Sequence, residues 1–130
     1  MPRHDPIWAK IDVEIFMGES FNGLTPAQKY VYWGLWILAV KYRTDVFLVD
    51  LHRPSFLAHV LQLSPQLFAS SVRAICKLGL AEKNLHGDLM IKGVKDCHKK
   101  LTWDKSPEVY LKRTQDVPEM ISKRGESQRD

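Results

Sequence analysis

The 130-residue sequence has few cysteines and no long apolar run. These two absences argue against a disulfide-rich protein and against a membrane-spanning one. Cys76 and Cys97 are too few for a disulfide scaffold and match no zinc-site spacing, so we expect reduced thiols in a cytoplasmic protein. The longest apolar run, residues 30–40, has eleven residues, whereas a membrane-spanning helix needs about 18 or more. The first residues lack the apolar stretch of a signal peptide. We therefore expect no membrane association.

The sequence also lacks the common motifs of catalysis and metal binding. It contains no glycine-rich phosphate loop, no G-x-S-x-G and no H-E-x-x-H. Cys97 and His98 are adjacent, whereas a catalytic Cys–His pair is normally assembled from distant parts of the chain. His52 and His59 are separated by Pro54, and no carboxylate or cysteine pair completes a metal shell. The sequence therefore predicts no enzyme, no metal, no cofactor and no small-molecule substrate.

The composition is that of an ordinary globular protein, with 45% hydrophobic and 26% charged residues. The length corresponds to one domain, or to one domain with a tail. Its charge is uneven: residues 1–64 carry six basic and six acidic side chains, and residues 65–130 carry thirteen and nine. The whole excess of +4 thus lies in the second half. This asymmetry indicates a nucleic-acid partner or an anionic surface, with a solvated basic face as the alternative.

The N-terminal segment alternates apolar and charged residues from Ile7 to Ile15. A period of two predicts a half-buried strand. After Asp12 a second reading is open, in which Asp12 caps a short helix through Phe16. Residues 18–23 have the composition of a loop.

The clearest local pattern is Thr25-Pro26-Ala27-Gln28. Thr25 can cap a helix, Pro26 suits its first position, and Gln28 can close a capping box. The helix is predicted to run to about Lys41, and it is apolar almost all round. We expect it to be the central pillar of the core, with a homodimer seam as the alternative use.

The rest of the chain reads as short elements separated by turn residues. Residues 46–49 predict a strand, and residues 55–61 a short helix. Ser64-Pro65 begins a third helix that ends at Leu78-Gly79. Residues 80–84 and 89–94 predict a β-hairpin around His86-Gly87-Asp88. Ser106-Pro107 opens a helix near residues 107–115, and the end after Val117 is predicted to be mobile.

This order of elements predicts an α+β, mainly helical fold of the winged helix-turn-helix type. Three helices would pack with a small antiparallel sheet, in which residues 46–49 pair with the hairpin. Residues 1–95 would form the winged-helix domain and residues 96–130 a basic extension. In this motif the second helix of the helix-turn-helix pair enters the DNA major groove.

The third helix, at 64–78, has the sidedness that this interpretation requires. At about 100° per residue, Phe68, Val72 and Ile75 fall on one apolar face. The opposite face is polar and contains no acid: Gln66, Ser70, Arg73 and Lys77. Arg and Gln can read guanine and adenine, and Lys can bind phosphate. The alternative is an ordinary solvated face of an amphipathic helix.

Further basic residues lie in the hairpin and beyond it. Lys83 and Lys92 flank the hairpin strands and could contact phosphate, although Asp88 makes the expected wing tip acidic. A denser patch around Trp103 consists of Lys95, Lys99, Lys100 and Lys105. It could bind duplex backbone, or single strands whose bases stack on the ring. Alternatively, Trp103 packs against the body and the lysines are solvated.

With these residues in place, the chain resembles the N-terminal winged-helix domain of phage replisome-organiser and replication-initiation proteins. The resemblance covers about residues 7–115. It rests on Ile7-Trp8-Ala9-Lys10-Ile11 through Leu24-Thr25, the helix at 28–40, the strand at 46–49, Ser64 through Val72-Arg73-Ala74-Ile75-Cys76-Lys77-Leu78-Gly79-Leu80, Leu89-Met90-Ile91-Lys92, and Ser106-Pro107-Glu108-Val109-Tyr110-Leu111-Lys112-Arg113. The resemblance implies origin or duplex DNA binding, often with self-association. Since the sequence ends at Asp130, we expect no second, helicase-loading domain.

The leading hypothesis is therefore a DNA-binding protein of phage or prophage replication, or of transcription control. Its expected partner is double-stranded DNA, with a possible homodimer and possible replication proteins. Two alternatives stay open: a protein-interaction module that uses the aromatic long helix, and a single-strand binder that uses Trp103.

Overall fold

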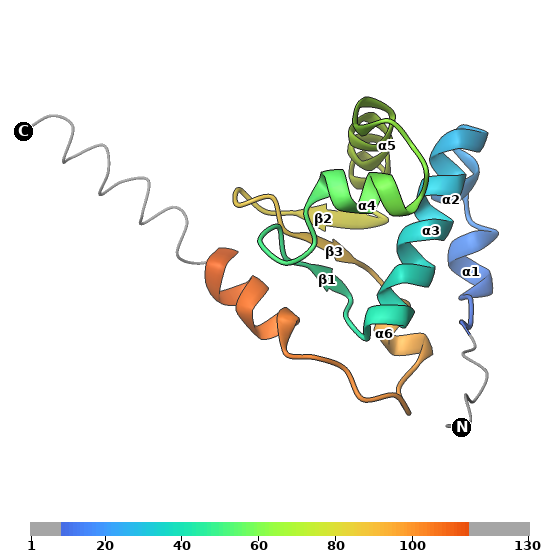
Figure 1. Ribbon diagram of the computed structural model, residues 1–130. Coiled ribbons are helices and arrows are strands. Elements are labelled where there is room, and N and C mark those ends of the chain that lie inside the picture. Colours follow the sequence, from blue (N-terminus) through green and yellow to red (C-terminus); the bar gives the residue numbers. More distant parts are fainter. Residues whose placement is uncertain (1–8, 115–130) are drawn as a thin grey trace, which may run out of the picture.

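The longest helix forms where its capping residues predict it. In the computed structural model, which describes residues 9–114, α3 spans Pro26–Tyr42 (Figure 1). The Gln28 backbone N–H donates to Thr25 Oγ1, and the Gln28 side-chain oxygen accepts from the Thr25 N–H at 2.9 Å. The helix ends at Arg43, whose φ of 57° is left-handed. The capping box and the predicted length of this helix are confirmed.

Helix α3 is the central pillar that its apolar sequence predicts. Tyr32, Leu35 and Trp36 are completely buried, and the helix packs against α5, α6 and β3. One stripe is exposed instead, formed by Tyr30, Trp33 and Ile37. The core therefore surrounds most, but not all, of this helix.

The N-terminal strand prediction is wrong within the described residues. Residues 9–12 form no strand, and Asp12 caps helix α1 (Val13–Phe16) by accepting from the N–H groups of Glu14 and Ile15. Two side chains hold the backbone of Lys10, which precedes this helix. Lys10 N–H donates to His98 Nε2, and Lys10 C=O accepts from Trp36 Nε1. Ile7 and Trp8 lie outside the described residues.

The segment 18–23 is also more regular than its composition predicts. Helix α2 occupies Glu19–Asn22, so the predicted loop is wrong there. Phe21 explains the difference, because its ring is buried against Phe16 and Tyr32, with ring centroids 5.1 and 5.8 Å apart. Burying one aromatic ring favours a helical turn over an open loop.

The remaining elements are β1 (Val46–Phe47), α4 (Pro54–Val60), α5 (Pro65–Lys77), β2 (Ala81–Lys83), β3 (Leu89–Ile91) and α6 (Val94–Cys97). Those from β1 to β3 follow the predicted order, whereas the sequence does not predict the short helix α6. Strand β1 is shorter than predicted, since residues 49–52 turn toward α4. Val94 begins α6, so the second hairpin strand also ends earlier than residue 94. The α+β, mainly helical class is confirmed.

The three strands form one antiparallel sheet in the order β1-β3-β2. Val46 pairs with Met90, and Lys83 pairs with Leu89, so β3 is central. Figure 1 shows α4 and α5 above this sheet, α3 at its right, and the orange helical segment 106–114 at its lower left. That segment contacts the sheet through Tyr110, which is buried with Val46 and Leu48.

The last helix begins slightly differently from its predicted cap. Ser106 is already helical, and its N–H donates to Asp104 Oδ1 at 2.9 Å, so Asp104 rather than Ser106 supplies the side-chain cap. Residues 115–130, including the predicted mobile end, lie outside the described residues.

Candidate nucleic-acid interface

Helix α5 presents the two faces that its sequence predicts. Ser64 Oγ accepts from the Leu67 N–H, Pro65 occupies the first turn, and Gly79 follows the helix with a φ of 79°. The inward face is buried and consists of Phe68, Ser71, Val72 and Ile75. The four polar residues predicted to face outward are all exposed: Gln66, Ser70, Arg73 and Lys77.

The chemistry of this exposed row suits a nucleic acid. Arg73 can donate two hydrogen bonds to guanine, and Gln66 can pair with adenine. The Ser70 hydroxyl donates to Leu67 C=O at 3.1 Å, so its lone pairs remain available to accept. Helix α5 contains no Asp or Glu, so nothing on the helix itself would repel a phosphate.

The turn between α4 and α5 is short and closed. Gln62 adopts a left-handed φ of 60°, and Leu63 N–H donates to Ala58 C=O at 2.9 Å. Leu61 is buried below the turn. The two helices also pack against each other, so α5 has a fixed orientation relative to the core.

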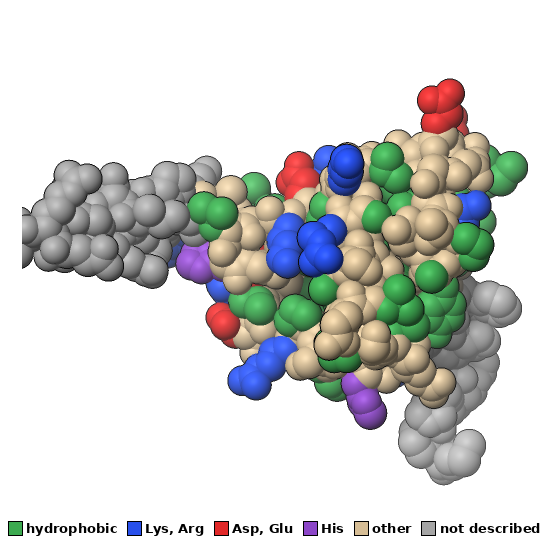
Figure 2. All heavy atoms as spheres, turned by 90° about the horizontal axis from the view of Figure 1, so that it is seen from above, with side chains coloured by type: hydrophobic (Ala, Val, Ile, Leu, Met, Phe, Trp, Pro, Cys, Tyr) green, Lys and Arg blue, Asp and Glu red, His purple; other side chains and the backbone are tan. Residues whose placement is uncertain are grey.

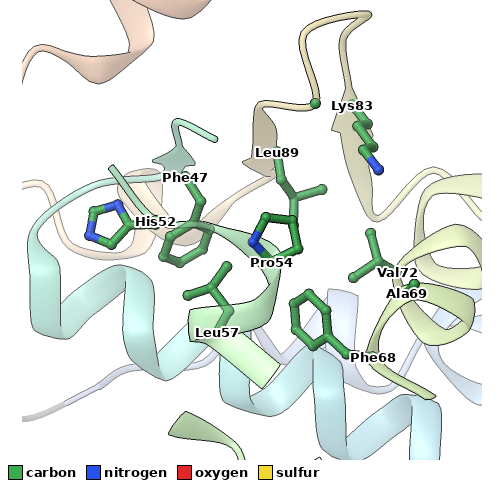
Figure 3. Close-up of a pocket in the computed structure, with 10 residues that line it drawn as sticks. Phe47, His52, Pro54, Leu57, Phe68, Ala69, Val72, Lys83 and Leu89 are labelled. Atoms are coloured by element: carbon green, nitrogen blue, oxygen red, sulfur yellow. The ribbon is translucent and has the colours of Figure 1, made fainter. Parts of the chain in front are cut away.

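Lys83 lies beside α5, on strand β2. Its side chain and the α5 residues Ala69 and Val72 are among the residues that line a cavity of about 50 Å³ (Figure 3). Apolar side chains form most of the wall, among them Phe47, Leu57, Phe68 and Leu89. This volume is far below the few hundred Å³ of ordinary ligand sites. The feature therefore places Lys83 next to α5 rather than indicating a small-molecule site.

The hairpin turn is not acidic at its surface, which corrects the prediction for Asp88. This carboxylate is 0% exposed. Its Oδ1 accepts from Val49 N–H at 2.9 Å, and its Oδ2 accepts from Asn84 Nδ2 at 2.9 Å and lies 3.1 Å from Arg113 Nε. Arg113, which lies 25 residues later in the 106–114 helix, therefore neutralises the charge of Asp88. No local pattern in the sequence indicates this pairing.

The hairpin also makes less use of Lys92 than its position predicts. Lys92 Nζ lies 3.4 Å from Glu82 Oε1, and both side chains are about half exposed. An exposed ion pair of this kind contributes little to stability, but it cancels one positive charge near the sheet. Lys83 is thus the stronger of the two hairpin candidates for a phosphate contact.

The other predicted lysines lie elsewhere on the molecule. Lys95 belongs to α6, Lys99 and Lys100 follow it, and all three are exposed, as is Lys105. Figure 1 places α6 at the opposite end of the molecule from α5. The structure therefore divides the predicted site residues into two surfaces. We call them the α5 surface (Gln66, Ser70, Arg73, Lys77, Lys83) and the α6 surface (Lys95, Lys99, Lys100, Lys105).

Figure 2 views the molecule from the α5 end. Lys and Arg side chains gather near the middle of this face, and the acidic side chains visible there are few and peripheral. A contiguous group of hydrophobic side chains lies at one edge of the same view.

The Trp103 ring packs against the body of the protein, which is the predicted alternative to an open ring for stacking bases. Its Nε1 donates to His98 C=O at 2.9 Å, and its ring meets the His98 ring edge-on at 6.1 Å. The side chain is half-buried against the core. A ring held in this way is not a free platform on which bases could stack.

Among the described residues, the fold engages the side chains that are most often reactive, His98 and the two cysteines. His98 is buried, its Nδ1 bonds Val94 C=O at 2.7 Å, and its Nε2 accepts from Lys10 N–H, so both ring nitrogens are occupied. Burial raises the pKa of the Cys76 and Cys97 thiols, which reduces the fraction of reactive thiolate. Within residues 9–114, no group of three His, Cys, Asp or Glu side chains could hold a metal ion.

One apolar surface lies apart from both basic surfaces. A groove of about 210 Å³ runs between α3 and the end of α4, lined mainly by Tyr30, Trp33, Ile37 and Leu61. Gly34 lets α4 approach here, since a Cβ at this position would lie 2.5 Å from a methyl group of Leu61. Trp36, by contrast, is fully buried and takes no part in this surface.

Comparisons with known proteins identify no relative. No family model matches the chain, and neither a curated protein nor a solved structure matches it. Among the described residues, no helix has both the length and the apolar character required to cross a membrane.

Proposed function

We propose that the protein is a DNA-binding winged-helix protein whose helix α5 lies in the major groove of duplex DNA. The observation that carries the proposal is the exposed row on α5, which is polar, partly basic and free of acids. A helix that is held by its apolar face and presents Arg, Gln and Lys outward has the chemistry of a recognition helix.

The surrounding fold supports this assignment. Helix α3, strand β1, helices α4 and α5 and the β2–β3 hairpin follow one another in the order of a winged helix-turn-helix, and the sheet order is β1-β3-β2. In this arrangement α4 crosses behind α5, and the hairpin is the wing that meets the backbone. Lys83 on β2 and Lys77 at the end of α5 are the phosphate ligands in this proposal.

The process that the protein serves is replication initiation or transcription control. The resemblance to phage replisome-organiser domains favours the first. A homodimer and contacts with replication proteins belong to the same proposal.

The test is duplex binding by the whole chain, measured by fluorescence anisotropy with a random-sequence duplex at several salt concentrations. Each phosphate contact contributes about 0.9 to the slope of log K against log salt. We expect tight binding at low salt that weakens steeply as salt rises. An absence of binding at low salt would refute the proposal.

A second candidate function is a protein-interaction module, and the groove beside Trp33 favours it. Exposed Tyr30 and Ile37 extend this groove along α3. Duplex binding by the wild type separates the two candidates, because an interaction module without a DNA site would not bind. Substitution of Trp33 by Ser, which leaves the α5 surface unchanged, should then leave the duplex affinity unchanged.

A further inference from the structure

We propose that the α6 surface is a second duplex-DNA site, so that one molecule bridges two DNA segments. This inference rests on the proposed function of the α5 surface and extends it. The α6 surface would hold the second duplex through contacts with its phosphate backbone alone.

The C-terminal end of α5 and the segment after α6 lie near opposite ends of α3. The C-terminal end of α5 lies near the start of α3, since a Cβ on Gly23 would meet a methyl group of Leu78 at 3.5 Å. The segment after α6 lies near the other end, where Asp104 N–H donates to Arg43 C=O at 2.8 Å. Figure 1 shows the same separation of α5 from α6.

The length of α3 gives the scale of the distance between the C-terminal end of α5 and the segment after α6. Its 17 residues rise about 1.5 Å each, which gives roughly 25 Å from end to end. The Debye length at physiological salt is about 8 Å. Exposed charges that lie more than a Debye length apart are largely screened from one another, so two groups of charges near opposite ends of such a helix act largely independently. A phosphate held at one end therefore does little to neutralise the other.

The α6 surface carries a net positive charge. Within residues 9–114, none of its four lysines takes part in an ion pair. Two acids interrupt the surface, Asp96 and Asp104, and both are exposed. Lys10 adds a further exposed charge, because its backbone N–H is bonded to His98 at the end of α6.

The surroundings of these lysines favour duplex phosphate over other anionic partners. Single-strand sites use open aromatic rings, whereas the Trp103 ring is packed and its N–H is bonded. Membrane-surface helices expose apolar residues beside their lysines, whereas α6 has only four residues and Val94 is turned into the core. Lysine ammonium groups on an otherwise polar surface match the evenly spaced charges of a duplex backbone.

The experiment mixes two short duplexes of unrelated sequence, one carrying a donor dye and the other an acceptor, with the full chain. Energy transfer reports bridging, and the anisotropy of each duplex alone reports single-site binding. Two variants each remove two charges and serve as controls for one another: Lys99→Gln/Lys100→Gln on the α6 surface and Arg73→Gln/Lys77→Gln on the α5 surface. Lys112→Gln, an exposed lysine of the 106–114 helix, is the control outside both surfaces.

We expect the wild-type protein to bridge even at concentrations at which its mass, measured in the same buffer, is that of a monomer. Both double variants should lose the energy transfer, and Lys112→Gln should keep it. The Lys99→Gln/Lys100→Gln variant should still bind one duplex, with the salt slope of the first binding step unchanged, because the α5 surface keeps its phosphate contacts.

Four results would overturn the inference. They are bridging retained in Lys99→Gln/Lys100→Gln, a wild type that binds one duplex but never two, bridging that occurs only in protein dimers, and displacement of the second duplex by a single strand more readily than by duplex. Failure of the proposed function is distinguishable from all four, because the anisotropy titration of Arg73→Gln/Lys77→Gln with a single duplex would then match that of the wild type.

Discussion

The buried Asp88–Arg113 pair allows a quantitative test of how helix 106–114 is attached. Arg113→Ala leaves the Asp88 carboxylate in a site that is 0% exposed, with two neutral donors and no cation. Removing one partner of a buried ion pair typically costs about 3–5 kcal/mol. The Arg113 side chain is 22% exposed, so water can partly replace it, and we expect the lower end of that range, about 3 kcal/mol.

The same arginine provides its own control. Its Nη1 lies 3.3 Å from Asp50 Oδ2, and the Asp50 side chain is 75% exposed. Asp50→Ala should therefore cost only about 0–1 kcal/mol. Urea denaturation followed by tryptophan fluorescence measures both changes in the free energy of unfolding. In thermal denaturation, Arg113→Ala should lower the melting temperature by roughly 10 °C.

Combining Arg113→Ala with Asp88→Asn completes the test. If the pair interacts as the structure places it, the double variant is more stable than the sum of the single effects predicts, by about 1–3 kcal/mol. Equal, small effects of Arg113→Ala and Asp50→Ala would refute the reasoning, because the buried carboxylate would then not depend on helix 106–114.

Three further predictions concern local structure. Thr25→Ala and Ser64→Ala each remove a helix cap and should cost about 1 kcal/mol, measured by thermal denaturation; unchanged melting temperatures would contradict these caps. Burial raises the pKa of Asp45, so the folded protein favours the protonated carboxyl. The stability linked to this group is therefore fully present below its ordinary pKa of about 3.9. It is lost as the pH rises through the higher pKa of the folded state. Asp45→Asn should therefore stabilise the protein at neutral pH and lose this advantage in acid, and urea midpoints at the two pH values would decide. Because burial raises the pKa of Cys76 and Cys97, iodoacetamide should alkylate both more slowly in the folded protein than in urea, and equal rates by mass spectrometry would contradict this.

Local interactions explain what the sequence predicts well. The capping box at Thr25 and the caps at Ser64 and Gly79 depend on neighbouring residues, so the bounds of α3 and α5 follow from them. The sidedness of α5 is likewise a local periodicity, and the structure exposes the polar row as predicted.

Contacts between distant residues explain what the sequence predicts badly. Lys10 is held by His98 and Trp36 rather than by a neighbouring strand, so alternation alone misassigns this segment. Asp88 looks like an exposed turn residue until Arg113 is placed beside it. The division of the basic residues into two surfaces also depends on the tertiary fold. Distance along the sequence does not reveal whether a lysine lies near α5 or near α6.

The central claim is that α5 binds DNA, and the most direct measurement compares duplex affinity between Arg73→Ala/Lys77→Ala and Lys112→Ala. Both variants should remain folded by circular dichroism, because all three side chains are exposed. We predict that the α5 variant loses at least about tenfold in affinity, since one good base contact contributes about 1–3 kcal/mol. Its salt slope should fall by about 1 for the lost phosphate contact of Lys77, while Lys112→Ala binds almost as the wild type does. Equal affinities of the α5 variant and the wild type would contradict the assignment of α5 as the DNA-binding helix.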